Sequence, residues 1–136
     1  MPLLVRDVMT ADVVTMGRTD SLRSADDVMR LGRIRHLPVI DEDGKLAGIV
    51  SQRDLFLSGV MRALGYGSHA QAKALDALLV KEAMHTEVFT TTPETPLVDA
   101  AKLLLQRKIG CLVVLQGDKI AGILTESDFV KLALAE

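Results

Sequence analysis

Hydrophobic residues recur with two different periods along this chain, and the changes between them predict short strands alternating with helices. After a β-branched run at residues 13–15, apolar and small residues fall on one helical face, with Asp20 or Ser21 available as the N-cap. The members of that face are Leu22, Ala25, Val28, Met29 and Gly32. Two apolar runs, residues 36–40 and 45–50, then flank an acidic turn and predict a hairpin. A second helix is expected to begin at Ser51.

The same order of elements returns later in the chain, so the sequence contains two copies of one unit. Residues 5–9, VRDVM, align with residues 80–84, VKEAM, at an offset of 75. The stretch GIVSQRDLF from Gly48 aligns with GILTESDFV from Gly122 at an offset of 74. Insertions and deletions concentrate in surface turns, so we expect the second copy to lack one residue in its hairpin turn. In that copy Thr95 is expected to cap the first helix and Pro96 to occupy its first position.

Each copy is therefore predicted to contain a strand, a helix, two strands and a helix. The fold class is α+β, with two pseudo-symmetric β-α-β-β-α units packed sheet to sheet, because about 50 residues cannot bury a three-stranded sheet alone. The copies span residues 1–55 and 80–136, and residues 56–79 form a helical insert. In the insert we expect the second helix to reach Leu64, a turn at residues 65–68, and a further helix at residues 72–79.

Composition limits the classes of partner. A chain of 136 residues with 49% hydrophobic residues can form a compact core. A net charge of −2 and 3% aromatic residues give neither the basic field nor the stacking platforms of a nucleic-acid binder. No apolar run approaches the ~18 residues of a membrane span, and the first residues do not resemble a signal peptide. We therefore expect a soluble, cytoplasmic protein. The single cysteine, Cys111, lies in an apolar run and is expected to be a buried small hydrophobe.

The two matching stretches each place a hydroxyl and a carboxylate where a strand meets a helix. Ser51 is followed by Asp54, and Thr125 by Asp128. One interpretation is a helix capping box, although such a box prefers Glu or Gln to the shorter Asp. The other interpretation is a binding site, because free N–H groups at a helix N-terminus attract phosphate and an ionised Asp accepts hydrogen bonds from paired ribose hydroxyls. A glycine three residues before each hydroxyl leaves room for a close approach to the backbone.

The repeated unit, the VRDVMT opening, the HLPVI strand and the Gly-x-x-Ser/Thr-x-x-Asp pattern together resemble a tandem pair of cystathionine β-synthase (CBS) domains, the Bateman module. The resemblance covers nearly the whole chain. It implies that the protein binds an adenosine-containing ligand (AMP, ADP, ATP or S-adenosylmethionine), regulates an effector protein, and forms a homodimer. It implies no required cofactor.

In this family each ligand cleft is composite, so the hydroxyl and Asp of one copy face the opening segment and second strand of the other. The resemblance thus implies one cleft formed by Thr125, Asp128, Ala11, Ile34 and Arg35. It implies a second cleft formed by Ser51, Asp54, Thr86, Ile109 and Gly110. Family members often carry a proline soon after the first strand; the second copy has Pro93 there, but the first has Arg18. The second copy also has Val113 where the first has Pro38, so the two clefts need not be equally competent.

Other candidate residues carry weaker signals. His36 could reach a phosphate or could be a partly exposed histidine at a strand end. His85 and Glu87 are not repeated with other ligand types at metal spacing, so they are interpreted as loop residues and no metal site is predicted. The sequence contains no combination of base and nucleophile, so no catalytic residue is predicted. The alternative to a regulatory sensor is a structural homodimerisation module with vestigial clefts.

Overall fold

The computed structural model describes residues 2–63 and 76–135. The chain divides into two compact units: unit 1 comprises Met1–Val13 and Val88–Glu136, and unit 2 comprises Val14–Glu87. We call residues 5–13 and 80–87, which precede the first strand of each copy, the opening segments. Each unit therefore combines the sheet and the two main helices of one copy with the opening segment of the other copy.

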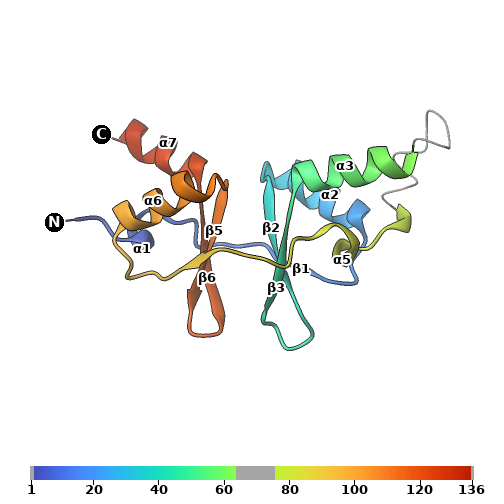
Figure 1. The fold of residues 1–136 in the computed structure, drawn as a ribbon, viewed down its shortest axis with the longest axis horizontal. Helices are drawn as coiled ribbons and strands as arrows, with labels where there is room; N and C mark the ends of the chain where they lie inside the picture. Colours follow the sequence, from blue (N-terminus) through green and yellow to red (C-terminus); the bar gives the residue numbers. More distant parts are fainter. Residues whose placement is uncertain (1, 64–75, 136) are drawn as a thin grey trace. The chain divides into compact units, whose positions relative to one another are not determined.

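Unit 2 holds a three-stranded sheet in the order β1-β2-β3. β1 is parallel to β2, and β2 is antiparallel to β3. Two long helices and one short helix complete the unit (Figure 1). Its elements are β1 (Met16–Gly17), α2 (Leu22–Gly32), β2 (His36–Ile40), β3 (Leu46–Ser51), α3 (Gln52–Ala63) and α5 (Val80–Ala83).

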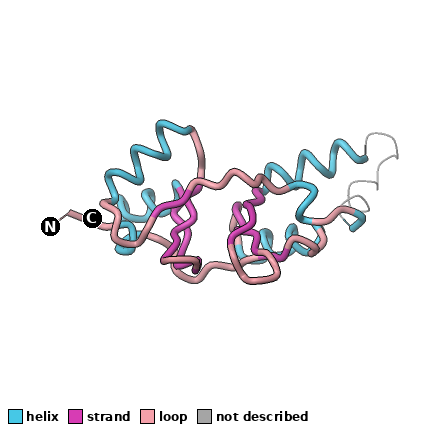
Figure 2. The backbone as a smooth tube through the Cα atoms, turned by 60° about the horizontal axis from the view of Figure 1, so that its bottom comes forward, coloured by secondary structure: helices cyan, strands magenta, loops and turns pink. Residues whose placement is uncertain are grey.

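Unit 1 repeats this arrangement with the sheet order β4-β5-β6. Figures 1 and 2 show the helices of each unit beside its own sheet. The elements of unit 1 are α1 (Val5–Val8), β4 (Thr90–Thr91), α6 (Leu97–Arg107), β5 (Cys111–Gln116), β6 (Lys119–Thr125) and α7 (Glu126–Ala135). The prediction of an α+β fold with two related units is confirmed.

The two hairpins explain the change of offset in the repeat. Ile40 pairs with Leu46 in the first copy, and Leu115 pairs with Ile120 in the second. Residues 41–45 therefore lie between the paired positions in the first copy and residues 116–119 in the second, which is one residue fewer. Both ladders also carry a register shift at the equivalent place, between Val39 and Ile40 and between Val114 and Leu115. The missing residue lies in the turn, as the sequence predicted.

Several boundaries differ from the prediction. The first strand is formed by Met16 and Gly17, which pair with Val39 and Ile40, and not by residues 13–15. Ser21 is the N-cap of α2 and accepts a hydrogen bond from the backbone of Ser24 at 3.1 Å.

In the second copy the cap is displaced by one residue. Pro96, not Thr95, is the N-cap of α6, which begins at Leu97. In the insert α3 ends at Ala63, and residues 64–75 lie outside the described part of the chain, together with the turn predicted at residues 65–68. The helix predicted over residues 72–79 does not continue to its end, because Leu79 forms a β-bridge with Ser21.

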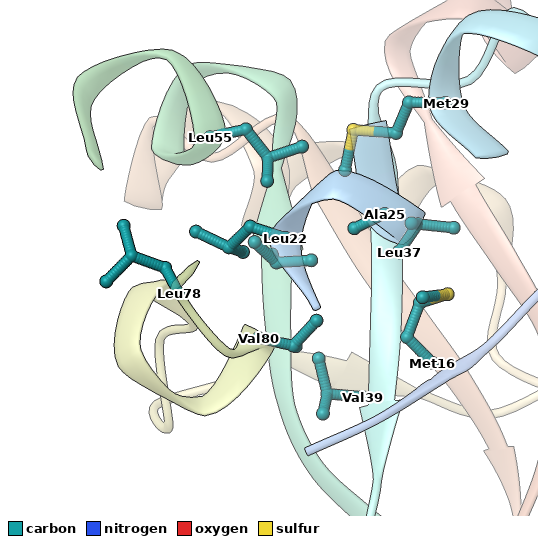
Figure 3. Close-up of a cluster of buried hydrophobic side chains, with 10 residues drawn as sticks. Met16, Leu22, Ala25, Met29, Leu37, Val39, Leu55, Leu78 and Val80 are labelled. Carbon is teal, nitrogen blue, oxygen red and sulfur yellow. The ribbon is translucent and has the colours of Figure 1, made fainter. Parts of the chain in front are cut away.

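Each opening segment contributes a side chain to the core of the unit that it joins. Val80 is fully buried in the core of unit 2, beside Leu22 and Val39 (Figure 3). Val5 is fully buried in the core of unit 1, beside Leu97 and other apolar side chains. Burying a valine side chain contributes about 1.5–3 kcal/mol, so the exchanged segments are integral to the units.

Short helices, which the hydrophobic pattern did not reveal, hold the opening segments in shape. Asp7 accepts a hydrogen bond from the backbone N–H of Leu4 at 2.8 Å, and Glu82 accepts one from Leu79 at 2.7 Å. A carboxylate that reaches back over one turn satisfies a free N–H at a helix start. None of the helices in the described residues has the length and apolar character required to cross a membrane.

Candidate ligand site at the strand to helix junctions

Asp54 and Asp128 lie in the first turns of α3 and α7 and cap the starts of these helices. Asp54 Oδ2 accepts a hydrogen bond from the Ser51 backbone at 2.8 Å, and Ser51 Oγ accepts one from the Asp54 backbone at 3.2 Å. In the second copy Asp128 Oδ2 accepts from the Thr125 backbone at 2.9 Å and from Thr125 Oγ1 at 3.4 Å. The capping-box interpretation of the sequence is therefore correct for the first copy, where both hydrogen bonds of the box are present. In the second copy the hydrogen bond from the Thr125 backbone to the Asp128 carboxylate corresponds to one of the two.

The second oxygen of each carboxylate contacts an opening segment. Asp128 Oδ1 accepts a hydrogen bond from Thr10 Oγ1 at 2.8 Å. Asp54 Oδ1 lies 2.8 Å from His85 Nε2. Because an ionised carboxylate has no proton to give, Nε2 is the donor in this contact. Each aspartate thus joins the N-terminus of a helix to the exchanged segment that packs beside it.

Backbone hydrogen bonds fix the opening segments at the same places. Thr10 and Ile123 exchange two hydrogen bonds of 2.9 Å, one in each direction. His85 and Ile49 exchange two in the same way, at 2.8 and 2.9 Å. These pairs form β-bridges between the opening segments and β6 or β3. The segments are therefore held by their main chains, and the side chains of Thr10 and His85 project from a fixed backbone.

The glycines that precede these bridges are required by this close approach. A Cβ atom on Gly122 would lie 2.8 Å from the carbonyl oxygen of Thr10 and 2.7 Å from Met9 Sδ. A Cβ atom on Gly48 would lie 2.7 Å from the carbonyl oxygen of His85. The sequence predicted that something approaches the backbone at these glycines, and in this structure it is the opening segment of the protein itself.

The two carboxylates differ in exposure. Asp128 is only 4% exposed. Asp54 is half-buried, and 66% of the side chain of its partner His85 is exposed. Burial of the Cys111 thiol in unit 1, and secondarily the charge of Asp128, raise the pKa of Cys111 to about 12. Cys111 is buried, as the sequence predicted.

The other predicted site residues are divided between the two units, and some lie next to these junctions. Ala11 and Thr86 are exposed and directly follow Thr10 and His85. The carbonyl of Arg35 accepts a hydrogen bond from the Gln52 backbone at 2.8 Å, beside Ser51. Unit 1 thus contains Thr125, Asp128 and Ala11 together with Ile109 and Gly110, and unit 2 contains Ser51, Asp54 and Thr86 together with Ile34 and Arg35. The composite clefts that combine residues of both units stay predictions.

Sequence reasoning missed Thr10 and His85, the residues that contact the two carboxylates. The signal was present in the repeat, because Thr10 and His85 are equivalent at the offset of 75 and each follows a methionine. Interpreting His85 as a plain loop residue overlooked that its imidazole contacts Asp54. Within the described residues no group of three or more potential metal ligands occurs.

Arg18 shows how the first copy accommodates the missing proline. The carbonyl of Arg18 accepts a hydrogen bond from the Lys81 backbone at 2.9 Å, and the carbonyl of Pro93 accepts one from Arg6 at 3.0 Å. The contact with the opening segment is therefore preserved. The Arg18 side chain instead donates to both oxygens of Glu42 at 2.8 Å. This hydrogen bond, with the charge of Arg18, lowers the pKa of Glu42, and Glu42 in turn raises the pKa of Arg18.

Comparison with known proteins identifies the family. The CBS domain model matches residues 5–58 and 80–135. The chain is 30% identical over 135 residues to a CBS domain-containing protein of Dictyostelium discoideum, a match that covers 98% of this chain and 93% of that protein. The chain belongs to the CBS domain family, and its two copies are a pair of CBS domains.

Two solved structures of similar fold contain adenosine compounds. The crystal structure of CBSX2 in complex with AMP has a TM-score of 0.77 and 28% sequence identity, and the match covers 97% of this chain and 96% of that one. The CBS domain pair of protein MJ0100, in complex with 5′-methylthioadenosine and S-adenosyl-L-methionine, has a TM-score of 0.76 and 25% identity, with 96% and 99% coverage.

Proposed function

We propose that this CBS domain pair is a regulatory module that binds an adenosine-containing ligand and signals the binding to an effector protein. The observation that carries the proposal is the repeated junction, in which a carboxylate is fixed at a helix N-terminus beside a hydroxyl residue. The complexes of CBSX2 with AMP and of MJ0100 with S-adenosyl-L-methionine support the ligand class. No catalytic step is assigned to the module.

The chemistry of the junction suits a nucleoside. Asp54 and Asp128 use one oxygen to cap a helix, which fixes the carboxylate and leaves further lone pairs for hydroxyl donors. The hydroxyls of Ser51 and Thr125 lie beside them at the helix start, where N–H groups favour a phosphate. We propose that AMP, ADP, ATP or S-adenosylmethionine binds here.

We further propose that the module forms a homodimer through its helices. Several apolar side chains of these helices are exposed in the single chain: Leu31, Phe56, Leu57, Val98, Leu105, Val130 and Leu134. Leu105 and Leu134 are each 80% exposed. Exposed apolar side chains on helices can form a protein interface, and a stable dimer buries at least about 1,000 Å².

A second candidate function is a homodimerisation module with vestigial clefts. The observation that favours it is that both oxygens of Asp54 and of Asp128 already accept hydrogen bonds from the protein. Under this alternative the aspartates only fasten the opening segments and cap the helices.

Native mass spectrometry of protein purified from cells distinguishes the two functions. The regulatory module is expected to retain a mass that corresponds to an adenosine compound, or to gain one when AMP or S-adenosylmethionine is added, on a dimeric species. A dimer that retains and gains no such mass supports the dimerisation module instead. A monomer under the same conditions contradicts the proposed assembly.

A further inference from the structure

Thr10 and His85 hold equivalent positions on the two carboxylates. In each junction the capping interaction occupies Oδ2, and the opening segment occupies Oδ1. Oδ1 is the oxygen that the helix N-terminus leaves free, so it is the oxygen that a ligand hydroxyl would use. The protein has therefore placed its own donor where the ligand donor is required.

We propose that Thr10 and His85 are internal competitors of the ligand for Asp128 and Asp54, and that their difference makes Asp54 the carboxylate that binds ligand more tightly. This inference rests on the proposed function. Thr10 and His85 follow the equivalent methionines Met9 and Met84, and we infer that this position sets the relative affinity of the two sites.

The burial of the two carboxylates supports this order. Asp128 is 4% exposed and accepts three hydrogen bonds, from Thr10 Oγ1, the Thr125 backbone and Thr125 Oγ1. Asp54 is half-buried and accepts two, from the Ser51 backbone and from His85. A ligand therefore meets a more accessible and less satisfied acceptor at Asp54.

The two competitors also differ in how they can withdraw. Both backbones are fixed by paired hydrogen bonds to Ile123 and Ile49, so only side-chain rotation can release a carboxylate. The imidazole of His85 is carried on two rotatable bonds and is 66% exposed, so it returns to water when a ligand displaces it. The Thr10 hydroxyl sits on Cβ and can withdraw only by rotating χ1, a bond whose rotation is restricted in a β-branched residue.

The competitor role and a plain structural role predict opposite changes in affinity. If Thr10 competes, Thr10→Val frees Asp128 Oδ1 and tightens the weaker site about tenfold, since the exchanged hydrogen bond involves a charged acceptor. If Thr10 only positions the carboxylate, the same substitution weakens binding. The stability of the chain falls in both cases, because a hydrogen bond is lost.

Isothermal titration calorimetry of the full chain with AMP provides the test, after co-purified ligand has been removed. For the wild type we expect two affinities, of which the tighter is lost in Asp54→Asn and the weaker in Asp128→Asn. Thr10→Val is expected to tighten the weaker site about tenfold, and His85→Ala to tighten the stronger one. His85→Gln, which retains an N–H donor, should resemble the wild type. Thr19→Val, at an exposed threonine of unit 2, is the matched control.

The outcomes separate this inference from the proposed function. If neither Asp variant loses AMP binding, or if Asp128→Asn loses the tighter site, the inference is wrong although the protein binds AMP. Weaker binding in Thr10→Val and His85→Ala also overturns it and makes both residues positioning residues. If Thr10→Val does not fold, His85→Ala decides the question, because its side chain is exposed. A wild type that binds neither AMP nor S-adenosylmethionine refutes the proposed function itself.

Discussion

Gly122→Ala tests whether the opening segment is fastened to β6 as the structure shows. The added Cβ would lie 2.8 Å from the Thr10 carbonyl oxygen, which belongs to the backbone and cannot rotate away. Thr10 exchanges two hydrogen bonds of 2.9 Å with Ile123, and both must lengthen to make room. Overpacking costs about 1–3 kcal/mol, and weakening two hydrogen bonds adds about 1 kcal/mol more. We expect a loss of roughly 2–4 kcal/mol in the free energy of unfolding.

Thermal and urea unfolding measure this loss. At about 3 °C per kcal/mol for a chain of this size, Gly122→Ala should lower the melting temperature by roughly 6–12 °C. Gly48→Ala should behave alike, because its Cβ would lie 2.7 Å from the His85 carbonyl. Gly32→Ala is the matched control: its Cβ would meet nothing closer than 3.6 Å, and alanine favours the helix. If Gly122→Ala melts within 2 °C of the wild type, by the same ~3 °C per kcal/mol, the reasoning is wrong.

Three further predictions concern backbone strain and titration. Arg33 and Lys108 have φ of 53° at the ends of α2 and α6, a left-handed conformation that costs about 1–2 kcal/mol. Arg33→Gly removes this cost but adds the backbone entropy of glycine, so the free energy of unfolding in urea melts should rise by about 0.5 kcal/mol. An unchanged or lower value contradicts this. Because burial raises the pKa of Cys111 to about 12, the neutral thiol should stabilise the fold fully below its ordinary pKa, and this effect should fall as pH rises toward 12. Cys111→Ala should reduce this alkaline loss of stability in pH-dependent melts. An identical alkaline profile contradicts the prediction. Because Arg18 lowers the pKa of Glu42, the pair should stabilise the chain above the ordinary glutamate pKa and lose that effect as pH falls through the lowered value. Glu42→Gln should therefore slightly reduce the fall in melting temperature at acid pH. An unchanged acid dependence argues against the contact.

The repeat made most of the fold predictable from the sequence. Two alignable copies indicated the order of strands and helices, and the change of offset located the shorter turn between β5 and β6. The first strand was misplaced at residues 13–15, because β-branched residues favour strands in general while pairing depends on the partner strand. Met16 and Gly17 pair with Val39 and Ile40 instead.

The candidate site was predictable only in part. Periodicity located Asp54 and Asp128 at helix starts, where local hydrogen bonds decide the geometry. Their second partners, Thr10 and His85, lie 118 and 31 residues away along the chain. Such contacts depend on which opening segment joins which sheet, and local sequence patterns do not report tertiary exchange of this kind.

The thermal shift of the wild type with AMP or S-adenosylmethionine, compared with the double variant Asp54→Ala and Asp128→Ala, tests the central claim most directly. A ligand that binds only the folded chain adds about 2.7 kcal/mol per site at 100 times its dissociation constant, so the wild-type melting temperature should rise by roughly 5–10 °C. The double variant should show no shift with either compound, although it melts lower than the wild type without ligand. If stripped wild-type protein shows no shift at millimolar ligand, the proposal of an adenosine-binding regulatory module is contradicted. If the double variant shifts as much as the wild type, the ligand binds without Asp54 and Asp128, and the proposed site is wrong.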